Sequence, residues 1–345
     1  MNKHFISGHV KSGIGEIPVT SAIWSNQDRW GAVQARWGIG RMSYTVNPGV
    51  YATGRPDESS LVFVTANYKL SFDHLRRALS GMNAWILVID TKGINVWCAA
   101  GKGTFGTGEL VYRIRHHQLE KFVSHRKIII PQLGAPGVAA HEVRDQTGFT
   151  VIYGPVRAVD IPKFISGGLK ATDLMRTIDF PLKERLKLIP VEIFYGKYFM
   201  ILVPSVFFIL AGLSPDGYSI DKAFYEGGHS LINLLAAYFA GCAFTPALLP
   251  WIPFRRFSDK GLLIGWIVSV ILAWAGFLGR SPYEIVSWFM LMGGLSSFMA
   301  MNFTGSSTFT SLSGVRKEMK TAIPVQIIMT GIGFIGFVIT RFVDI

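Results

Sequence analysis

The pattern of hydrophobic and polar positions divides the chain into two parts. Before about residue 170, short apolar runs alternate with polar stretches; after residue 197, long apolar segments follow one another with short polar links. Four short runs rich in β-branched and aromatic residues predict strands, namely Leu61–Thr65, Ala84–Asp90, Lys127–Ile130 and Phe149–Tyr153. The intervening pattern predicts helices at Phe72–Gly81 and from about Val138 to Asp145.

This alternation indicates a Rossmann-like α/β domain, with a parallel sheet covered by helices on both faces. In such sheets ligands bind at the carboxyl ends of the strands. The loops that follow the predicted strands are therefore candidate binding elements. They are Thr65–Tyr68, the segment around Cys98, Pro131–Gly137 and Gly154.

The second part predicts a membrane domain. Five apolar segments have about the length that a membrane-crossing helix needs, namely Tyr198–Leu213, His229–Trp251, Leu262–Leu278, Ile285–Phe303 and Ala322–Val343. Ionisable side chains are few in these segments, which favours an anchor over a conduit. The expected division is a soluble domain at 1–170, an amphipathic basic linker at 171–197 and a transmembrane domain at 198–345.

Charge predicts the orientation of these spans. The formal net charge is +12, but the basic residues are scattered in the first part and clustered beside the apolar spans, which argues against nucleic acid and for membrane lipid. The link at 254–260 and the link at 305–321 each carry three Lys or Arg residues. With those links inside, and with no signal-peptide core at the N-terminus, we expect a multi-pass protein of the cytoplasmic (inner) membrane whose N-terminal domain is cytoplasmic.

Cysteine is scarce, which makes one of its positions informative. The chain has two cysteines, Cys98 and Cys242, and no disulfide framework is implied. Cys98 lies among small residues and glycines, and Asn95 can cap a short helix that carries it. A thiolate is a soft, strongly donating metal ligand. We therefore expect Cys98 to offer sulfur to the metal of a bulky cofactor, and Cys242 to be a packing residue.

Other motifs compete with this interpretation. Gly101–Gly106 fits the spacing G-x-G-x-x-G, but about ten residues separate it from the preceding strand, whereas a dinucleotide fingerprint follows its strand directly. His116, His117 and His125 lack partners at zinc-site spacing. No C-x-x-C run is present, so the chain predicts no iron–sulfur cluster of its own.

The segment Asn95-Val96-Trp97-Cys98-Ala99-Ala100-Gly101-Lys102 resembles the signature N-(V/I)-W-C-A-(A/G)-G-K of the HgcA family, the corrinoid proteins of the microbial mercury-methylation pair. All eight positions match. The stretches Val62–Leu70 and Gln132–Val138 also resemble the corrinoid domain of the corrinoid iron–sulfur protein in the acetyl-CoA pathway. The order of a corrinoid domain followed by about five membrane helices agrees with the resemblance.

The resemblance implies a cobalamin-type corrinoid whose cobalt takes the Cys98 thiolate as its lower axial ligand, which makes Cys98 both the metal ligand and the catalytic residue. The cap around it and the neighbouring loops supply the expected cofactor-binding residues, which are Thr65, Asn67, Asn95, Val96, Trp97, Cys98, Ala99, Ala100, Gly101, Lys102, Gly103, Thr104, Phe105, Gly134, Ala135, Pro136, Gly137 and Gly154.

The activity that the resemblance implies is methyl transfer to Hg(II), giving methylmercury. The implied partners are a ferredoxin-like [4Fe–4S] protein (HgcB) as electron donor and a methyltetrahydrofolate-type methyl donor, acting directly or through a separate methyltransferase. Two alternatives stay open. One is a corrinoid methyl carrier of one-carbon (acetyl-CoA pathway) metabolism, and the other is a membrane-tethered nucleotide-binding protein that uses the loop at 101–106.

Overall fold

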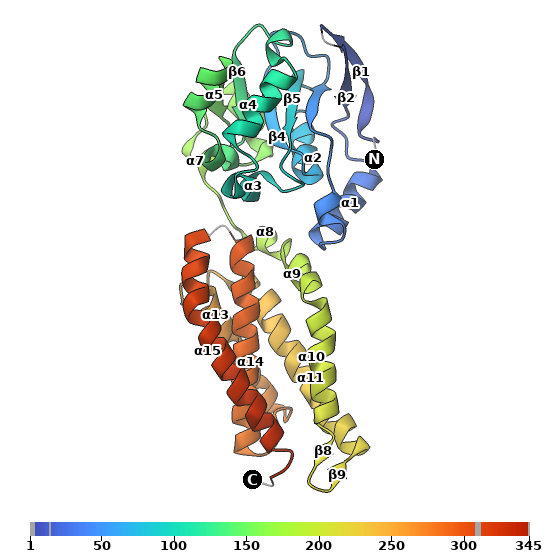
Figure 1. Cartoon of the computed structure of the whole chain (residues 1–345), viewed down its shortest axis with the longest axis vertical. Helices are drawn as coiled ribbons and strands as arrows, with labels where there is room; N and C mark the ends of the chain where they lie inside the picture. The colour runs from blue at the N-terminus through green and yellow to red at the C-terminus, as the bar shows by residue number, and fades with distance from the viewer. Residues whose placement is uncertain (1–3, 14, 308–311, 344–345) are drawn as a thin grey trace. The chain divides into compact units, whose positions relative to one another are not determined.

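The computed structural model describes residues 4–13, 15–307 and 312–343. It divides into two compact units, Met1–Asp179 and Phe180–Ile345. Figure 1 shows that the first unit is an α/β domain and that the second is helical.

A seven-stranded sheet organises the first unit, in the order β1-β2-β3-β5-β4-β6-β7. Its strands are β1 (Ile6–Ser12), β2 (Gly15–Thr20), β3 (Gly49–Thr53), β4 (Val62–Ala66), β5 (Ala84–Ile89), β6 (Lys127–Ile130) and β7 (Thr150–Tyr153). The four strands expected from the hydrophobic pattern are confirmed as β4 to β7, and these pair in parallel.

The sheet is mixed rather than wholly parallel, which corrects one part of the sequence prediction. Strand β3 pairs antiparallel with β5, and β1 and β2 form an antiparallel hairpin at the edge. The three N-terminal strands escaped prediction. In the hairpin most side chains are exposed or half-buried, so its apolar alternation is weak.

Helices cover both faces of the sheet, as expected. Along β5 the side chains of Trp85, Leu87 and Ile89 pack under one set of helices, and those of the alternate residues pack under the other. The first face is covered by α3 (Val96–Lys102), α4 (Thr107–His116) and α5 (Ala140–Thr147), and the second by α2 (Lys69–Ala78) and α6 (Ile161–Ser166). Each fully buried aliphatic or aromatic side chain contributes roughly 1.5–3 kcal/mol by leaving water.

The remaining helices of this unit are short. Helix α1 (Asn26–Arg36) begins in a capping box in which Ser25 and Asp28 bond each other's backbone amides. Short 3₁₀ turns lie at η1 (Arg41–Ser43), η2 (Leu119–Lys121), η3 (Gln132–Gly137) and η4 (Ala158–Asp160). Helix α7 (Asp173–Arg176) ends the regular structure before the helical unit.

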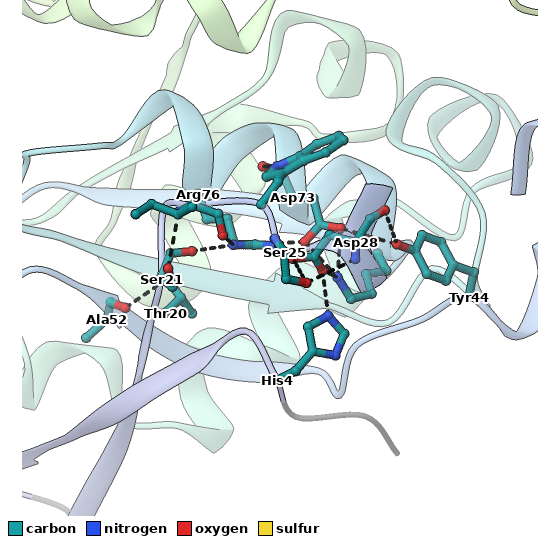
Figure 2. Close-up of polar contacts among 12 residues, drawn as sticks. His4, Thr20, Ser21, Ser25, Asp28, Tyr44, Ala52, Asp73 and Arg76 are labelled. Carbon is teal, nitrogen blue, oxygen red and sulfur yellow. Dashed lines mark hydrogen bonds and ion pairs between the residues drawn. The ribbon is translucent and has the colours of Figure 1, made fainter. Parts of the chain in front are cut away.

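A buried ionic network fastens α1 to α2, as Figure 2 shows. The Lys69 ammonium lies 2.5 Å from Asp28 and 2.7 Å from Asp73, and the Arg76 guanidinium bonds both carboxylates at 2.7–2.9 Å. All four side chains are at least 95% buried. Burial alone would raise the pKa of Asp28, but hydrogen bonds from Lys69, the Ser25 amide and His4 outweigh it and lower that pKa.

The second unit contains four helices that are long and apolar enough to cross a membrane, spanning Ile220–Leu248, Phe257–Trp274, Pro282–Gly305 and Ser313–Ile339. A bent pair, Leu182–Tyr195 and Lys197–Leu210, meets at 56° and would make a fifth. Its elements are α8 (Leu182–Leu186), α9 (Ile189–Tyr195), α10 (Lys197–Leu210), β8 (Leu213–Ser214), β9 (Gly217–Tyr218), α11 (Ile220–Phe239), the π-helical turn η5 (Ala240–Phe244), α12 (Thr245–Leu248), α13 (Phe257–Trp274), α14 (Pro282–Asn302), η6 (Phe303–Ser306) and α15 (Leu312–Ile339).

The first expected span therefore differs from the prediction. Helix α10 has 14 residues, which at 1.5 Å per residue is short of a bilayer's apolar thickness.

Charged groups also enter the helices more than the sequence suggested. Lys260 donates to the carbonyls of Leu249 and Ile252, and Glu318 accepts from the Ser258 amide, so these buried charges satisfy backbone groups that helix ends leave unpaired.

Candidate functional site

The carboxyl ends of the parallel strands β4 to β7 meet at one edge of the sheet. The loops expected to bind a ligand follow these ends, so the fold brings Asn67, helix α3, the η3 turn and Gly154 to the same edge. Helix α3 and η3 are in direct contact there, because a Cβ on Gly137 would lie 3.1 Å from Ala100 Cα. The topology thus assembles the expected loops into one region.

Helix α3 presents the thiol of Cys98 to solvent. Asn95 caps the helix, its side-chain oxygen accepting from the Cys98 amide at 2.9 Å, and Gly103 ends it in a left-handed conformation at φ +81°. Val96, Ala99 and Ala100 face the sheet and are buried, while Cys98 is exposed. The cap predicted from Asn95 is confirmed.

The small residues of α3 lie on two different sides of the helix. Ala99 and Ala100 lie on the inner side of α3, so they let the helix approach the η3 turn rather than clearing space outside it. On the outer side, exposed Gly101 follows Cys98 by one turn. The open surface beside the sulfur therefore comes from Gly101, with exposed Lys102 and Gly103 following it.

Asn67 holds the loop that leads into α3. Its side-chain oxygen accepts from the Thr91 amide at 3.1 Å, the Thr91 hydroxyl at 2.8 Å and the Gly93 amide at 3.1 Å. Its amide nitrogen donates to Asp90 at 3.1 Å. Both the oxygen and the nitrogen of the Asn67 amide thus bond the loop 90–93, and these bonds fix the position of the cap.

Glu109 braces the same loop from α4. Its carboxylate accepts from the Asp90 amide at 2.8 Å and pairs with Arg113 at 2.6 Å. Burial alone would raise the pKa of Asp90, but hydrogen bonds from the Lys92 side chain and amide outweigh it and lower the pKa. The positive φ of Lys92 (+58°) turns the chain at this point. Sequence reasoning missed Glu109, because its role depends on contact with a residue 19 positions away.

The η3 glycines are needed by the packing of this edge. A Cβ on Gly134 would lie 2.5 Å from the Phe105 ring, and one on Gly137 would overlap the Phe105 carbonyl oxygen. A Cβ on Gly154 would lie 3.1 Å from the side chain of Ile129. These glycines let the loops close over buried Phe105 and β6. This packing explains why glycine stands at these positions, and the explanation requires no ligand.

The expected site residues thus fall into three groups by exposure. The exposed ones are Cys98, Gly101, Lys102, Gly103 and Pro136. The half-buried ones are Asn95, Trp97, Thr104, Ala135 and Gly137. The buried ones, which shape the edge from behind, are Thr65, Asn67, Val96, Ala99, Ala100, Phe105, Gly134 and Gly154.

A large ligand that carries amide groups and a soft metal fits the outer surface of this edge. The thiol of Cys98 is an exposed soft donor. The side-chain oxygen of Gln132, in the η3 turn, is buried and accepts no hydrogen bond among the described residues, so it is free to accept from a ligand. Gln132 was not among the expected site residues, although its loop was. Within the described part of the chain no three His, Cys, Asp or Glu side chains could hold a metal ion together, so a metal here would arrive with other ligands of its own.

The competing motifs take ordinary structural places. The glycine-rich stretch at 101–106 joins α3 to α4, and so links two helices instead of a strand and a helix. His116 stacks on Tyr112, and His125 contacts the Ser60 carbonyl. Cys242 is fully buried with Tyr238 and Met299 in the helical unit, as a packing residue would be.

Comparisons with known proteins concern the part of the chain that holds this edge. Residues 38–165 match the model of the CdhD family, described as CO dehydrogenase/acetyl-CoA synthase delta subunit. An acetyl-CoA decarbonylase/synthase complex subunit gamma of Methanopyrus kandleri is 37% identical over 123 residues, which are 35% of this chain and 26% of that protein. The same subunit of Archaeoglobus fulgidus is 31% identical over 118 residues, 34% of this chain and 25% of that protein.

A corrinoid/iron-sulfur protein large subunit of Moorella thermoacetica is 30% identical over 118 residues, 34% of this chain and 26% of that protein. The chain therefore spans about a quarter of the length of the curated relatives that it matches. Residues 38–165 are thus similar to a CdhD-family domain and to these gamma and large subunits. The match includes β3 to β7 and α3, and excludes α1 and the helical unit.

Proposed function

We propose that this chain binds a corrinoid against the outer surface of α3 and takes part in methyl transfer, with the Cys98 thiolate as the lower axial ligand of cobalt. The observation that carries the proposal is the exposed thiol on a short capped helix at the carboxyl edge of the sheet. The relation of this domain to a corrinoid/iron-sulfur protein large subunit supports it, as does the eight-residue resemblance to the HgcA signature.

The chain's own residues would position the sulfur and keep it available. Asn95 fixes the first turn of α3 through the Cys98 amide, and Asn67 fixes the loop before it. Gly101 leaves the surface beside the sulfur flat enough for a macrocycle, and Gln132 offers a buried acceptor to an amide side chain of the ligand. Because the thiol is exposed, no side chain has to move before it can bind a metal.

A bound corrinoid would supply an organometallic methyl group, and the Cys98 thiolate would be the soft, electron-donating group that this chain offers to its metal. An electron-rich metal suits methyl transfer to an electrophilic acceptor. We propose Hg(II) as that acceptor and methylmercury as the product. Two electrons must then return to the site, and we assign their delivery to a ferredoxin-like [4Fe–4S] partner of the HgcB type, and the supply of methyl groups to a methyltetrahydrofolate-type donor.

A second candidate function is a methyl carrier of one-carbon metabolism, with the acetyl-CoA pathway as its setting. The relatives favour it, because several are named as subunits of acetyl-CoA decarbonylase/synthase complexes. The relatives named above favour it more than they favour mercury methylation, which their names do not mention. The two functions share the corrinoid and Cys98 and differ in the acceptor of the methyl group.

We place the protein in the cytoplasmic membrane, with the α/β unit on the cytoplasmic side. Four to five long apolar helices support membrane insertion. The orientation follows from basic residues that cluster at two alternate links, where Arg255, Arg256, Arg316, Lys317 and Lys320 are all exposed.

The first experiment tests the axial ligand. Full-length protein and the variants Cys98→Ala and Cys98→Thr are purified and reconstituted with cobalamin, and cobalt content and visible spectra are measured. We expect stoichiometric cobalt and a spectrum that shifts in both variants, because Thr keeps the size of the side chain but donates weakly. Cys242→Ala is the matched control and should leave the spectrum unchanged. Reconstituted wild type without cobalt would refute both candidate functions, and identical spectra in wild type and both Cys98 variants would refute the thiolate ligand.

The second experiment separates the acceptors. Methylated holoprotein is offered Hg(II) in one reaction and the acetyl-CoA synthase of an acetyl-CoA pathway in another. Transfer to Hg(II) that Cys98→Thr abolishes supports the first candidate. Efficient transfer to the synthase with none to Hg(II) supports the second.

A further inference from the structure

Helix α1 exposes its large apolar side chains to solvent, whereas a helix that packs only on its own domain would bury them. Asp28, Ala32 and Ala35 form its buried face. Trp30, Val33 and Trp37, at spacing i, i+3 and i+7, form the opposite face, which points to solvent. Trp30 is 64% exposed and Trp37 is 43% exposed. Large aromatic side chains gathered in water on one helix face indicate an interaction surface.

The surface continues past the end of the helix. Ile39 and Met42 are exposed in the segment that follows α1. The backbone of Met42 reaches the loop before α3, since a Cβ on Gly93 would lie 2.5 Å from the Met42 carbonyl oxygen. We call Trp30, Val33, Trp37, Ile39 and Met42 the aromatic wing. It borders the edge that carries Cys98, and most of it lies outside the stretch that matches the CdhD family.

The charges around the aromatic wing are positive. Arg29 and Arg36, seven residues apart, flank Val33 along one side of α1, and Arg41 lies between Ile39 and Met42. The sole acidic residue in the range 21–46 is Asp28, which is 1% exposed and neutralised by Lys69 and Arg76. The occupant of this surface should therefore be apolar where it meets the wing and anionic beside it.

We propose that the aromatic wing docks on the anionic lipid surface of the membrane that the helical unit crosses. Three observations point to lipid. Trp with flanking Arg is the composition of interfacial membrane anchors. The surrounding charge complements anionic headgroups. The α/β unit belongs to the same chain as helices that can cross a membrane, so lipid is present at high effective concentration and weak docking suffices.

The experiment uses the full chain in nanodiscs and reads tryptophan fluorescence. Wild type and Trp30→Phe/Trp37→Phe are compared in discs of equimolar phosphatidylcholine and phosphatidylglycerol, with brominated or plain acyl chains. The chain has nine Trp, so the wild-type emission minus that of the variant isolates Trp30 and Trp37. We expect bromination to quench most of this difference emission. Equal difference emission in the two kinds of disc overturns the proposal.

A second comparison tests the charges and does not touch the aromatic residues. Each Arg near an anionic surface contributes about 1 kcal/mol, so Arg29→Gln/Arg36→Gln should lower the docked-to-undocked ratio by about 30-fold in the anionic discs. Lys121→Gln/Lys127→Gln removes two exposed cations elsewhere on the unit and is the matched control. If both variants reduce quenching equally, or neither reduces it, the surface does not recognise anionic lipid. Protection of the wing that appears only when a protein is added, and never with lipid, would also overturn the proposal.

Discussion

Exchanging the amide of Asn67 with the carboxylate of Asp90 tests whether this pair positions the helix that carries Cys98. Asn67 is 93% buried, and its amide makes four hydrogen bonds to the loop 90–93. Asn67→Ala removes all four and leaves the buried amides of Thr91 and Gly93 without an acceptor. At about 1 kcal/mol for each lost bond and more for an unsatisfied buried donor, the local cost is about 2–4 kcal/mol.

Asn67→Asp keeps the acceptor for Thr91 and Gly93 but sets a second carboxylate where the amide nitrogen lay 3.1 Å from Asp90. Repulsion between the two carboxylates should cost about 2–4 kcal/mol at this partly exposed site. Adding Asp90→Asn restores a donor, because the new amide can donate to the carboxylate introduced at position 67. Asp90→Asn alone loses a pairing with exposed Lys92, so it should change the protection of α3 little.

The assay is hydrogen exchange at the amides of α3, measured on the full chain in nanodiscs. A loss of about 2 kcal/mol speeds exchange by about 30-fold, so Asn67→Ala and Asn67→Asp should both show at least that change. The double variant should recover most of the protection. Asn83→Ala, which removes a side-chain bond to the Arg55 amide before the start of β5, whereas the loop 90–93 follows the end of that strand, is the control. Unchanged exchange in Asn67→Ala, or a double variant no better protected than Asn67→Asp, would refute the positioning role.

Three further predictions follow from the same contacts. Asn95→Ala should cost α3 about 1 kcal/mol by removing its cap, which would appear as a roughly fivefold faster exchange of the Cys98 amide, and Asn95→Ser should restore most of it. Asp28→Ala should destabilise the α/β unit by about 3–5 kcal/mol in chemical denaturation, because the buried cations Lys69 and Arg76 then share Asp73 alone. Folding lowers the pKa of Asp28, so the stabilisation by its carboxylate is complete above the unfolded pKa near 4 and is lost as pH falls through the folded pKa. The free energy of unfolding of Asp28→Ala should therefore decrease less with falling pH than that of the wild type. Burial, with repulsion from His116 and Arg113, lowers the pKa of His117, so stability should fall as pH drops below about 6.5, and His117→Gln should flatten that slope. A pH slope unchanged in His117→Gln would show that another group titrates.

The α/β core could be predicted because its signal is local. Strands β4 and β5 are buried on both faces and β6 is buried after its first residue, and such strands appear in the sequence as continuous apolar runs. Strand β7 is less buried, but Val151, Ile152 and Tyr153 still form an apolar run. The cap of α3 could be predicted for the same reason, since Asn95 and Cys98 are three residues apart. Strands β1 and β2 and the first half of the bent helix pair lack such a run, because their side chains are largely exposed or half-buried.

The positioning contacts around Cys98 could not be predicted, because they join residues that only the fold brings together. Asn67 and Gly93 are 26 residues apart, and Glu109 meets the Asp90 amide across 19. The sequence placed Asn67 in the binding loop without showing that both ends of its amide bond the loop 90–93. An asparagine in a loop is compatible with a ligand contact and with a loop brace, and the hydrogen-bond partners decide between them.

The contacts that brace the loop before α3 also explain how a thiol at this edge could serve as a metal ligand. An exposed cysteine on a seven-residue helix would be mobile if the helix depended on its own hydrogen bonds, because isolated helices of that length are unstable in water. Here the helix is fixed at three points, by the Asn95 cap, by the loop that Asn67 braces, and by the close approach of Ala100 to Gly137 of η3. The sulfur is therefore free to bind while its backbone is held, and ligand geometry would be set by contacts one layer behind it. Replacing those buried residues should thus weaken metal binding, even though none of them needs to touch the metal.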